Sequence, residues 1–392
     1  MDHDQEHLPP DSPLMTMSHS FLHDEMLKLS IPGPSRDPTY YIGDGNTVLL
    51  VDNTLFKVHR SILMKDKSAF ETMFQLSTEA DSARSDCSTT VTEGESDDNP
   101  IRLQGDTGDE FRALLWALYA LPHELMSATS SDANCTMLVN LARVAHKYQF
   151  RSIETWVLSA VHNYYSRPGA FDPVPTTTPP TLPPAAPANA PPSLEQLTEL
   201  AALCERSDLL DLAIARWKKQ IGEGKDLALA IIIGERLSLR PIVGLAYHAM
   251  MLKGRAHWET ESTLSRDQRV RLLSGYYALT KMWEALPGQP PPLSHTVRCT
   301  SNQRCNKAFG QLWKAVLEGG SDILPGLQRE DVLTKLMLAE STIKVLLENN
   351  GHVLLGQPVD GLPTCKESAL VVTAFKVREF KDSLTDYFMD DV

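Results

Sequence analysis

The sequence predicts an α+β N-terminal domain followed by an all-α C-terminal region, and three observations lead to this fold class. Two short apolar runs, residues 47–51 and 55–58, flank an Asp-Asn-Thr turn, which is typical of a β-hairpin. After residue 193, apolar residues recur mainly at helical spacing. Between these two patterns, residues 168–192 hold ten prolines, a composition that favours an extended linker.

The hairpin is followed by further elements of the N-terminal domain. Apolar residues recur at helical spacing over 62–74, 111–121 and 137–150, and each stripe predicts a helix with one buried face. The short run at 101–103 predicts a third strand. The sequence therefore predicts a small sheet flanked by helices.

The C-terminal region carries helix-start signals. Ser193 with Gln196, and Ser265 with Gln268, form two capping boxes that open predicted helices. Pro241 stands where a first-turn proline belongs. Further helices are predicted over 308–317 and 331–347, so we expect an array of helical hairpins.

Composition divides the chain into folded and flexible parts. Residues 1–38 carry seven acidic and two basic side chains, and residues 77–100 carry seven acidic side chains and one arginine. Neither stretch has enough apolar residues to form a core. We therefore predict five parts: a disordered acidic N-terminus (1–37), a folded domain (38–166) with a disordered acidic insert (77–100), a Pro-rich linker (167–192) and a helical region (193–390).

Charge and hydropathy exclude several classes of protein. The 392 residues include 50 acidic and 37 basic side chains, a net charge of −13, which argues against direct binding to nucleic acid or anionic membranes. The longest aliphatic run, residues 227–233, is far shorter than the ~20 residues that span a bilayer. The N-terminus lacks the order of a signal peptide, and the six scattered cysteines are typical of reduced thiols. We expect an intracellular, soluble protein.

Residues 44–74 carry the most informative motif. Its first part is a predicted strand, turn and strand followed by Phe56-x-Val58-His59-Arg60-x-x-Leu63, then Ser68-Ala69-Phe70 and Met73-Phe74. Further along the chain, the motif continues at Phe111-x-x-Leu114-Leu115-x-x-Leu118-Tyr119 and at Leu141-Ala142-x-x-Ala145-x-Lys147-Tyr148. In order and spacing, these pieces resemble the BTB/POZ domain over about residues 38–165. The amino-acid sequence of the first strands is especially similar to that of the BTB proteins abundant in mushroom-forming fungi.

The resemblance implies a protein-interaction scaffold that pairs with itself as a homodimer or recruits partner proteins. In one version the chain is a substrate adaptor that binds the cullin of a ubiquitin ligase. In the alternative version it is a BTB-type transcriptional or chromatin regulator. Either version places the protein in the cytoplasm or the nucleus, and the sequence does not choose between them.

His59 is the residue in this motif whose side chain titrates near neutral pH. It follows an alternating strand and begins a helix, where a polar side chain can satisfy backbone groups. No serine or cysteine nucleophile stands at a recognised spacing from it, and the chain has no P-loop, G-x-G-x-x-G or H-E-x-x-H motif. We therefore interpret His59 as structural, and expect no catalytic residue, no cofactor and no enzymatic activity.

A second candidate site lies in the helical region. His295-x3-Cys299-x5-Cys305 offers three possible zinc ligands, with Cys365 as a conceivable fourth. The spacing is looser than that of a zinc knuckle, and free cysteines are among the most buried residue types. We interpret these cysteines as buried thiols and predict no metal. A metal-binding protein, or an enzyme that uses this cluster, is the alternative.

Overall fold

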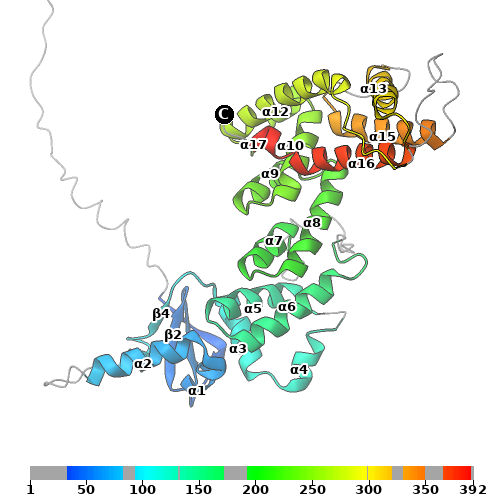
Figure 1. Ribbon diagram of the computed structural model, residues 1–392. Helices are drawn as coiled ribbons and strands as arrows, with labels where there is room; N and C mark the ends of the chain where they lie inside the picture. The colour runs from blue at the N-terminus through cyan, green and yellow to red at the C-terminus, as the bar shows by residue number, and fades with distance from the viewer. Residues whose placement is uncertain are drawn as a thin grey trace, which may run out of the picture. The chain divides into compact units, whose positions relative to one another are not determined.

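The computed structural model describes residues 33–82, 93–130, 133–171, 192–297, 299–319, 330–348 and 365–389. It is mostly helical, with a small four-stranded mixed sheet near the N-terminus, which confirms an α+β layout (Figure 1). The chain divides into two compact units. Unit 1 contains residues up to 120 and 147–152, and unit 2 contains 121–146 and the residues from 153 onward. Residues 121–146 and 153–166, which we expected in the N-terminal domain, are thus grouped with the C-terminal helices.

The sheet of unit 1 has the strand order β1-β3-β2-β4. Strands β2 (Thr47–Val51) and β3 (Thr54–Val58) pair in antiparallel fashion, with Leu49 opposite Phe56, and form the predicted hairpin. Strand β4 (Ile101–Leu103) adds to β2 in parallel, as the predicted third strand. All five residues of β2 are buried because this strand lies in the middle of the sheet.

Strand β1 (Ser35–Tyr41) corrects the prediction that residues 1–37 are disordered, because residues 35–37 belong to the sheet. It pairs in parallel with β3, with an irregular register. Asp37 is 2% exposed, and its carboxylate accepts hydrogen bonds from the N–H groups of Thr39 and Tyr40 and from Arg112 Nε. Sequence patterning missed this strand because its charged residues and Pro38 hide the alternation that marks a strand.

The helix predicted over 62–74 is interrupted. The structure has α1 (Arg60–Leu63), a 3-10 turn at Lys65–Lys67 and α2 (Ala69–Ser82). Asp66 has a φ of 63°, a left-handed conformation that stops a helix, and its carboxylate accepts hydrogen bonds from Ser152. This long-range contact compensates for the strained backbone, and the spacing of apolar residues does not predict it.

Aromatic rings form the core of unit 1. Helix α3 (Gly108–Tyr119) brings Phe111 to 5.0 Å from Phe56 of β3, in an edge-to-face arrangement. Phe70 of α2 stacks on Tyr148 at 4.5 Å. Phe56, Phe70 and Phe111 are all fully buried, so the predicted apolar stripes of these segments do face a core.

The predicted acidic insert, residues 77–100, is ordered at its ends. Residues 77–82 belong to α2, and residues 93–100 form turns beside the sheet, while residues 83–92 lie outside the described residues. Gly94 accepts a hydrogen bond from the backbone N–H of Val48, and Asp97 pairs with Arg36 and with the Tyr41 hydroxyl. The end of the insert is therefore bound to the sheet, through Asp97 to strand β1 and through Gly94 to strand β2.

Unit 2 is an array of helices, several of which begin at predicted capping boxes. The hydroxyl of Ser193 accepts from the Gln196 N–H ahead of α7, and that of Ser265 accepts from the Gln268 N–H ahead of α12. Its described helices are α4 (Pro122–Ser127), α5 (Cys135–Lys147, which ends in unit 1), α6 (Arg151–Tyr165, which begins in unit 1), α7 (Leu194–Leu203), α8 (Ser207–Gly222), α9 (Leu227–Arg236), α10 (Arg240–Leu252), α11 (Arg255–Thr260), α12 (Arg266–Ala285), the 3-10 turn η2 (Leu286–Gly288), α13 (Asn302–Glu318), α15 (Val332–Glu348), α16 (Lys366–Ser383) and α17 (Asp386–Met389).

Large side chains link these helices to one another. The Trp217 indole N–H donates to Thr198, and the Trp313 indole N–H donates to the carbonyl of Leu286, so both buried tryptophans have a polar partner. Phe388 of α17 stacks on Tyr247 of α10 with ring centroids 5.2 Å apart. The same ring lies so close to Gly275 of α12 that any Cβ there would clash with it.

Most of the predicted N-terminus (1–32) and most of the predicted Pro-rich linker (172–191) lie outside the described residues. In the described part of the chain, no helix combines the length and the apolar character needed to cross a membrane.

Candidate functional site

His59 and Arg60 stand at the junction of β3 and α1. The backbone N–H of His59 donates to the Tyr119 hydroxyl, and the His59 ring Nδ1 lies 2.9 Å from the same oxygen. Its Nε2 lies 3.3 Å from a carboxylate oxygen of Asp44. The Arg60 N–H donates to the Asn46 side chain, which provides a partner at the start of α1. Both residues thus make contacts that hold this junction in place.

The structure brings together four metal-type donors in unit 2: His295, Cys299, Cys305 and Cys365. His295 and Cys299 lie in the irregular segment that precedes α13, and Cys305 lies in the first turns of α13. Cys365 is the residue before α16. Two segments that are 60 residues apart in the sequence therefore meet at one point.

The donor atoms of these four residues are close together. The Nδ1 atom of His295 is 3.6 Å from the Sγ of Cys299 and 3.6 Å from the Sγ of Cys365. The Sγ atoms of Cys299 and Cys305 are also 3.6 Å apart, and all four donor atoms lie within 4.8 Å of one another. We name these four residues the Cys3His cluster.

The four side chains differ in exposure, and two of the cysteines have pKa values that are shifted in opposite directions. Cys305 and Cys365 are buried, whereas His295 and Cys299 are partly exposed. Burial and hydrogen bonds with the neighbouring cysteines raise the pKa of Cys305 to about 11. Burial alone would raise the pKa of Cys365, but hydrogen bonds with His295 and with the Thr296 backbone N–H outweigh it and lower the pKa to about 6.

The local backbone explains why these donors converge. The Cys299 N–H donates to the carbonyl of Thr296, the residue after His295, and the two donors His295 and Cys299 lie 3.6 Å apart. The Ser301 hydroxyl accepts from the Arg304 N–H and starts α13, so that Cys305 follows one turn later. The structure brings together the four residues that the sequence offered as possible zinc ligands, with Cys365 as the fourth. Cys305 and Cys365 are also buried, as the interpretation of buried thiols expects.

A second group of donors, His146, Glu154 and Cys204, also lies in unit 2. His146 Nδ1 is 2.7 Å from a carboxylate oxygen of Glu154, the distance of a direct hydrogen bond. Burial raises the pKa of the Cys204 thiol to about 12. Sequence reasoning missed this group, because the three residues belong to α5, α6 and the end of α7 and share no short spacing.

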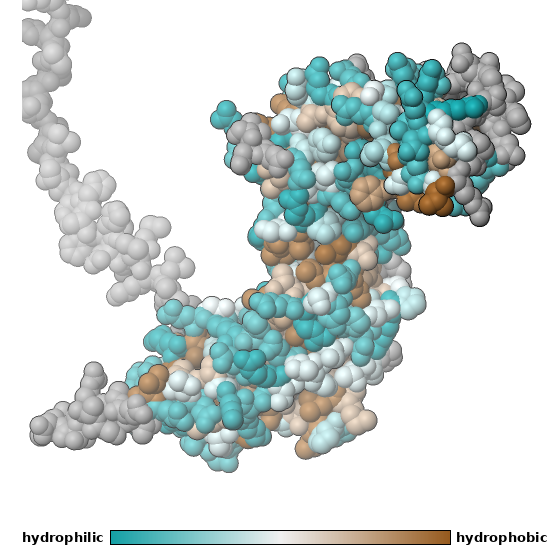
Figure 2. Space-filling model, viewed as in Figure 1, coloured by the Kyte–Doolittle hydropathy of each residue, from teal (hydrophilic) through white to brown (hydrophobic). Residues whose placement is uncertain are grey.

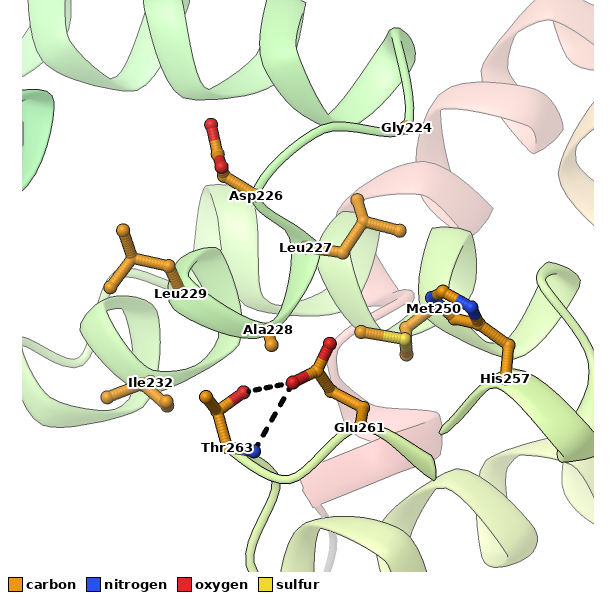
Figure 3. Close-up of a pocket in the computed structure, with 10 residues that line it drawn as sticks. All are labelled: Gly224, Asp226, Leu227, Ala228, Leu229, Ile232, Met250, His257, Glu261 and Thr263. Atoms are coloured by element: carbon orange, nitrogen blue, oxygen red, sulfur yellow. Dashed lines mark hydrogen bonds between the residues drawn. The ribbon is translucent and has the colours of Figure 1, made fainter. Parts of the chain in front are cut away.

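Helices α9, α10 and α11 border a pocket of about 350 Å³ (Figure 3). Leu227 and Met250 contribute apolar side chains to its wall, and Asp226, His257 and Glu261 contribute polar ones. Glu261 accepts hydrogen bonds from the hydroxyl and the N–H of Thr263. The Glu261 carboxylate is therefore hydrogen-bonded to the neighbouring loop. The donor atoms of the Cys3His cluster lie closer to one common point than the polar groups of this pocket do.

Comparisons with models of protein families, with curated proteins and with solved structures find no match for this chain.

Proposed function

We propose that this protein acts by binding other proteins, with a BTB/POZ-like N-terminal module that pairs with itself or recruits a partner. The observation that carries the proposal is the order of elements in unit 1. A β2–β3 hairpin leads through His59 and Arg60 into α1 and α2, and β4 then returns to the sheet ahead of α3. The residues that carry the resemblance occupy this framework, with Phe56, Phe70 and Phe111 at its centre.

The open edge of the sheet supports self-association. Strand β1 is an outer strand, and an outer strand presents unpaired backbone groups to which another chain can add. Ser35, Arg36 and Thr39 of this strand are exposed. A second copy that pairs along β1 would extend the sheet.

The helical unit supplies a second candidate surface for partners. On α12, Val270, Leu273 and Tyr277 recur at helical spacing and are 40%, 50% and 66% exposed. On α16, Val371 and Phe375 are 67% and 63% exposed, and Figure 2 shows hydrophobic surface over the α15–α16 region. Exposed apolar stripes of this kind are typical of protein-binding faces.

The proposal has two versions. As a substrate adaptor, the N-terminal module would bind a cullin and the helical unit would bind the client. As a transcriptional or chromatin regulator, the homodimer would act in a nuclear assembly. In both versions the protein acts through binding surfaces and catalyses no reaction, and either version places it in the cytoplasm or the nucleus.

Light scattering on the full chain tests self-association. We expect a dimer whose mass is unchanged in the double variant Val371→Lys, Phe375→Lys, because the exposed pair lies in the helical unit. A pull-down with a cullin tests the adaptor version, and the same double variant should still retain the cullin while it loses client proteins. A chain that stays monomeric at every concentration and retains no cullin would contradict the proposal.

A further inference from the structure

The Cys3His cluster has the donors and the spacing of a metal centre. We propose that His295, Cys299, Cys305 and Cys365 bind one Zn²⁺ ion, and that this ion is a structural clip between the start of α13 and the start of α16. The proposal goes beyond protein binding, because it concerns how the helical unit is held together.

The spacing of the donors matches a tetrahedron around zinc. With Zn–S bonds of about 2.3 Å and a Zn–N bond of about 2.0–2.1 Å, tetrahedral ligands place two sulfurs about 3.8 Å apart and a sulfur and a nitrogen about 3.6 Å apart. The observed Nδ1–Sγ distances are both 3.6 Å, and the Cys299–Cys305 Sγ–Sγ distance is 3.6 Å. Small shifts of the side chains would complete the coordination sphere.

The same distances argue against a disulfide in this structure. A disulfide joins its sulfurs at about 2.05 Å, whereas Cys299 and Cys305 hold theirs 3.6 Å apart. Among the described residues, Cys299, Cys305 and Cys365 carry thiol groups and form no disulfide.

The donor types favour zinc over other ions. Three thiolates and one imidazole are a common structural zinc set, whereas calcium and magnesium need oxygen ligands. Iron–sulfur clusters usually take four cysteines, or two histidines with two cysteines in the Rieske type. The Cys3His cluster fits neither pattern.

Binding requires the three thiols to lose their protons, so up to three H⁺ are released per Zn²⁺ bound. His295 binds through Nδ1 and therefore carries its hydrogen on Nε2. Three thiolates and Zn²⁺ leave a net charge of −1. The Thr296 N–H, which donates to Cys365, and the N-terminal ends of α13 and α16 stabilise this negative charge.

The arrangement is that of a closed site. Four protein donors fill a tetrahedral zinc ion and leave no position for water or substrate, which separates structural from catalytic zinc sites. The ion would join residues 295–305 to residue 365, and α15, which lies between them in the sequence, packs against both α13 and α16. The clip therefore closes a three-helix group.

Metal analysis of the purified full chain tests the proposal. We expect about one equivalent of zinc in the wild type and in Cys204→Ser, but a loss of at least tenfold in Cys299→Ser. Cys204 is the matched control because it is a partly buried thiol in the other donor group. Replacement of zinc by Co²⁺ should give the visible d–d bands and the thiolate-to-metal charge-transfer band of a tetrahedral thiolate site.

A wild-type protein that is folded by circular dichroism, contains no zinc and shows no such bands on Co²⁺ titration would overturn the proposal. Retention of full zinc content by Cys299→Ser would overturn it as well. Because the cobalt spectrum is measured on the wild type, the outcome does not depend on whether a variant folds. Light scattering reports on protein binding independently, so failure of the two proposals can be told apart.

Discussion

Two groups of histidine, cysteine and carboxylate side chains lie in the helical unit, and the distances between their donor atoms differ. In the Cys3His cluster, neighbouring donors are 3.6 Å apart, as ligands around a shared ion would be. In the second group, His146 and Glu154 are 2.7 Å apart, whereas ligands of one zinc ion would hold the nitrogen and oxygen about 3.4 Å apart. The second pair is already satisfied by its own hydrogen bond.

The difference teaches that donor type alone does not define a metal site. His146, Glu154 and Cys204 have suitable atoms, but the imidazole and the carboxylate are hydrogen-bonded to each other and burial raises the pKa of the thiol to about 12. In the Cys3His cluster, the four donor atoms lie within 4.8 Å of one another, and weak sulfur hydrogen bonds join neighbouring donors. A cation replaces those weak bonds with strong ones.

The largest expected effect is a loss of protein stability when a ligand of the Cys3His cluster is replaced. Cys305→Ser removes a buried ligand from the first turns of α13, and loss of a structural metal is among the most destabilising changes. We expect the melting temperature to fall by roughly 10 °C, but by less than about 3 °C in Cys204→Ser. Differential scanning fluorimetry in zinc-containing buffer measures both, and equal shifts in the two variants would remove the distinction between the clusters.

Chelation should give the next largest effect. A strong zinc chelator should lower the melting temperature of the wild type, because an ion that binds only the folded state stabilises it. Zinc added in excess should restore the original value, and magnesium should not. Cys204→Ser should respond as the wild type does, and Cys305→Ser should not respond. A wild type that is indifferent to the chelator would show that the cluster holds no metal.

Alkaline pH should affect the second group. Burial raises the pKa of Cys204 from 9.0 to about 12, so the folded protein holds this proton more tightly than the unfolded chain. The resulting stabilisation is complete below pH 9 and is lost as the pH rises towards 12. Between pH 8 and pH 10 it should account for about 1 kcal/mol of unfolding free energy. Urea unfolding at both pH values should therefore show a steeper loss in the wild type than in Cys204→Ser.

The smallest effect is expected at His146. Its side chain is 36% exposed, and partly exposed ion pairs contribute about 0–1 kcal/mol. His146→Gln should change the melting temperature by less than about 3 °C and leave the zinc content unchanged. A loss of zinc in this variant would mean that the second group, and not the Cys3His cluster, holds the metal.

Local signals predicted much of the fold. The β2–β3 hairpin, strand β4 and the capping boxes at Ser193 and Ser265 lie where the sequence placed them, because a pattern of neighbouring residues marks each of them. Strand β1 and the break at Asp66 were missed. Asp37 accepts a hydrogen bond from Arg112, and Asp66 accepts one from Ser152. Both donors are distant in the sequence, and no local pattern predicts such partners.

The sequence predicted only part of the candidate site, because one of its four residues is distant from the others in the sequence. His295, Cys299 and Cys305 are close in the sequence, although their spacing matches no common zinc motif. Cys365 joins them because α16 packs on α15, and α15 packs on α13, which is a property of the folded helices. The choice between buried thiols and a metal site depends on the distances between the donor atoms, and the sequence contains no such distance.

X-ray absorption at the zinc edge of the purified wild-type protein tests the central claim most directly. We expect the zinc ion to be bound by three sulfurs at about 2.3 Å and one nitrogen at about 2.0–2.1 Å, with no water. A shell made only of nitrogen and oxygen, or one with an open position occupied by solvent, would contradict a closed site formed by His295, Cys299, Cys305 and Cys365.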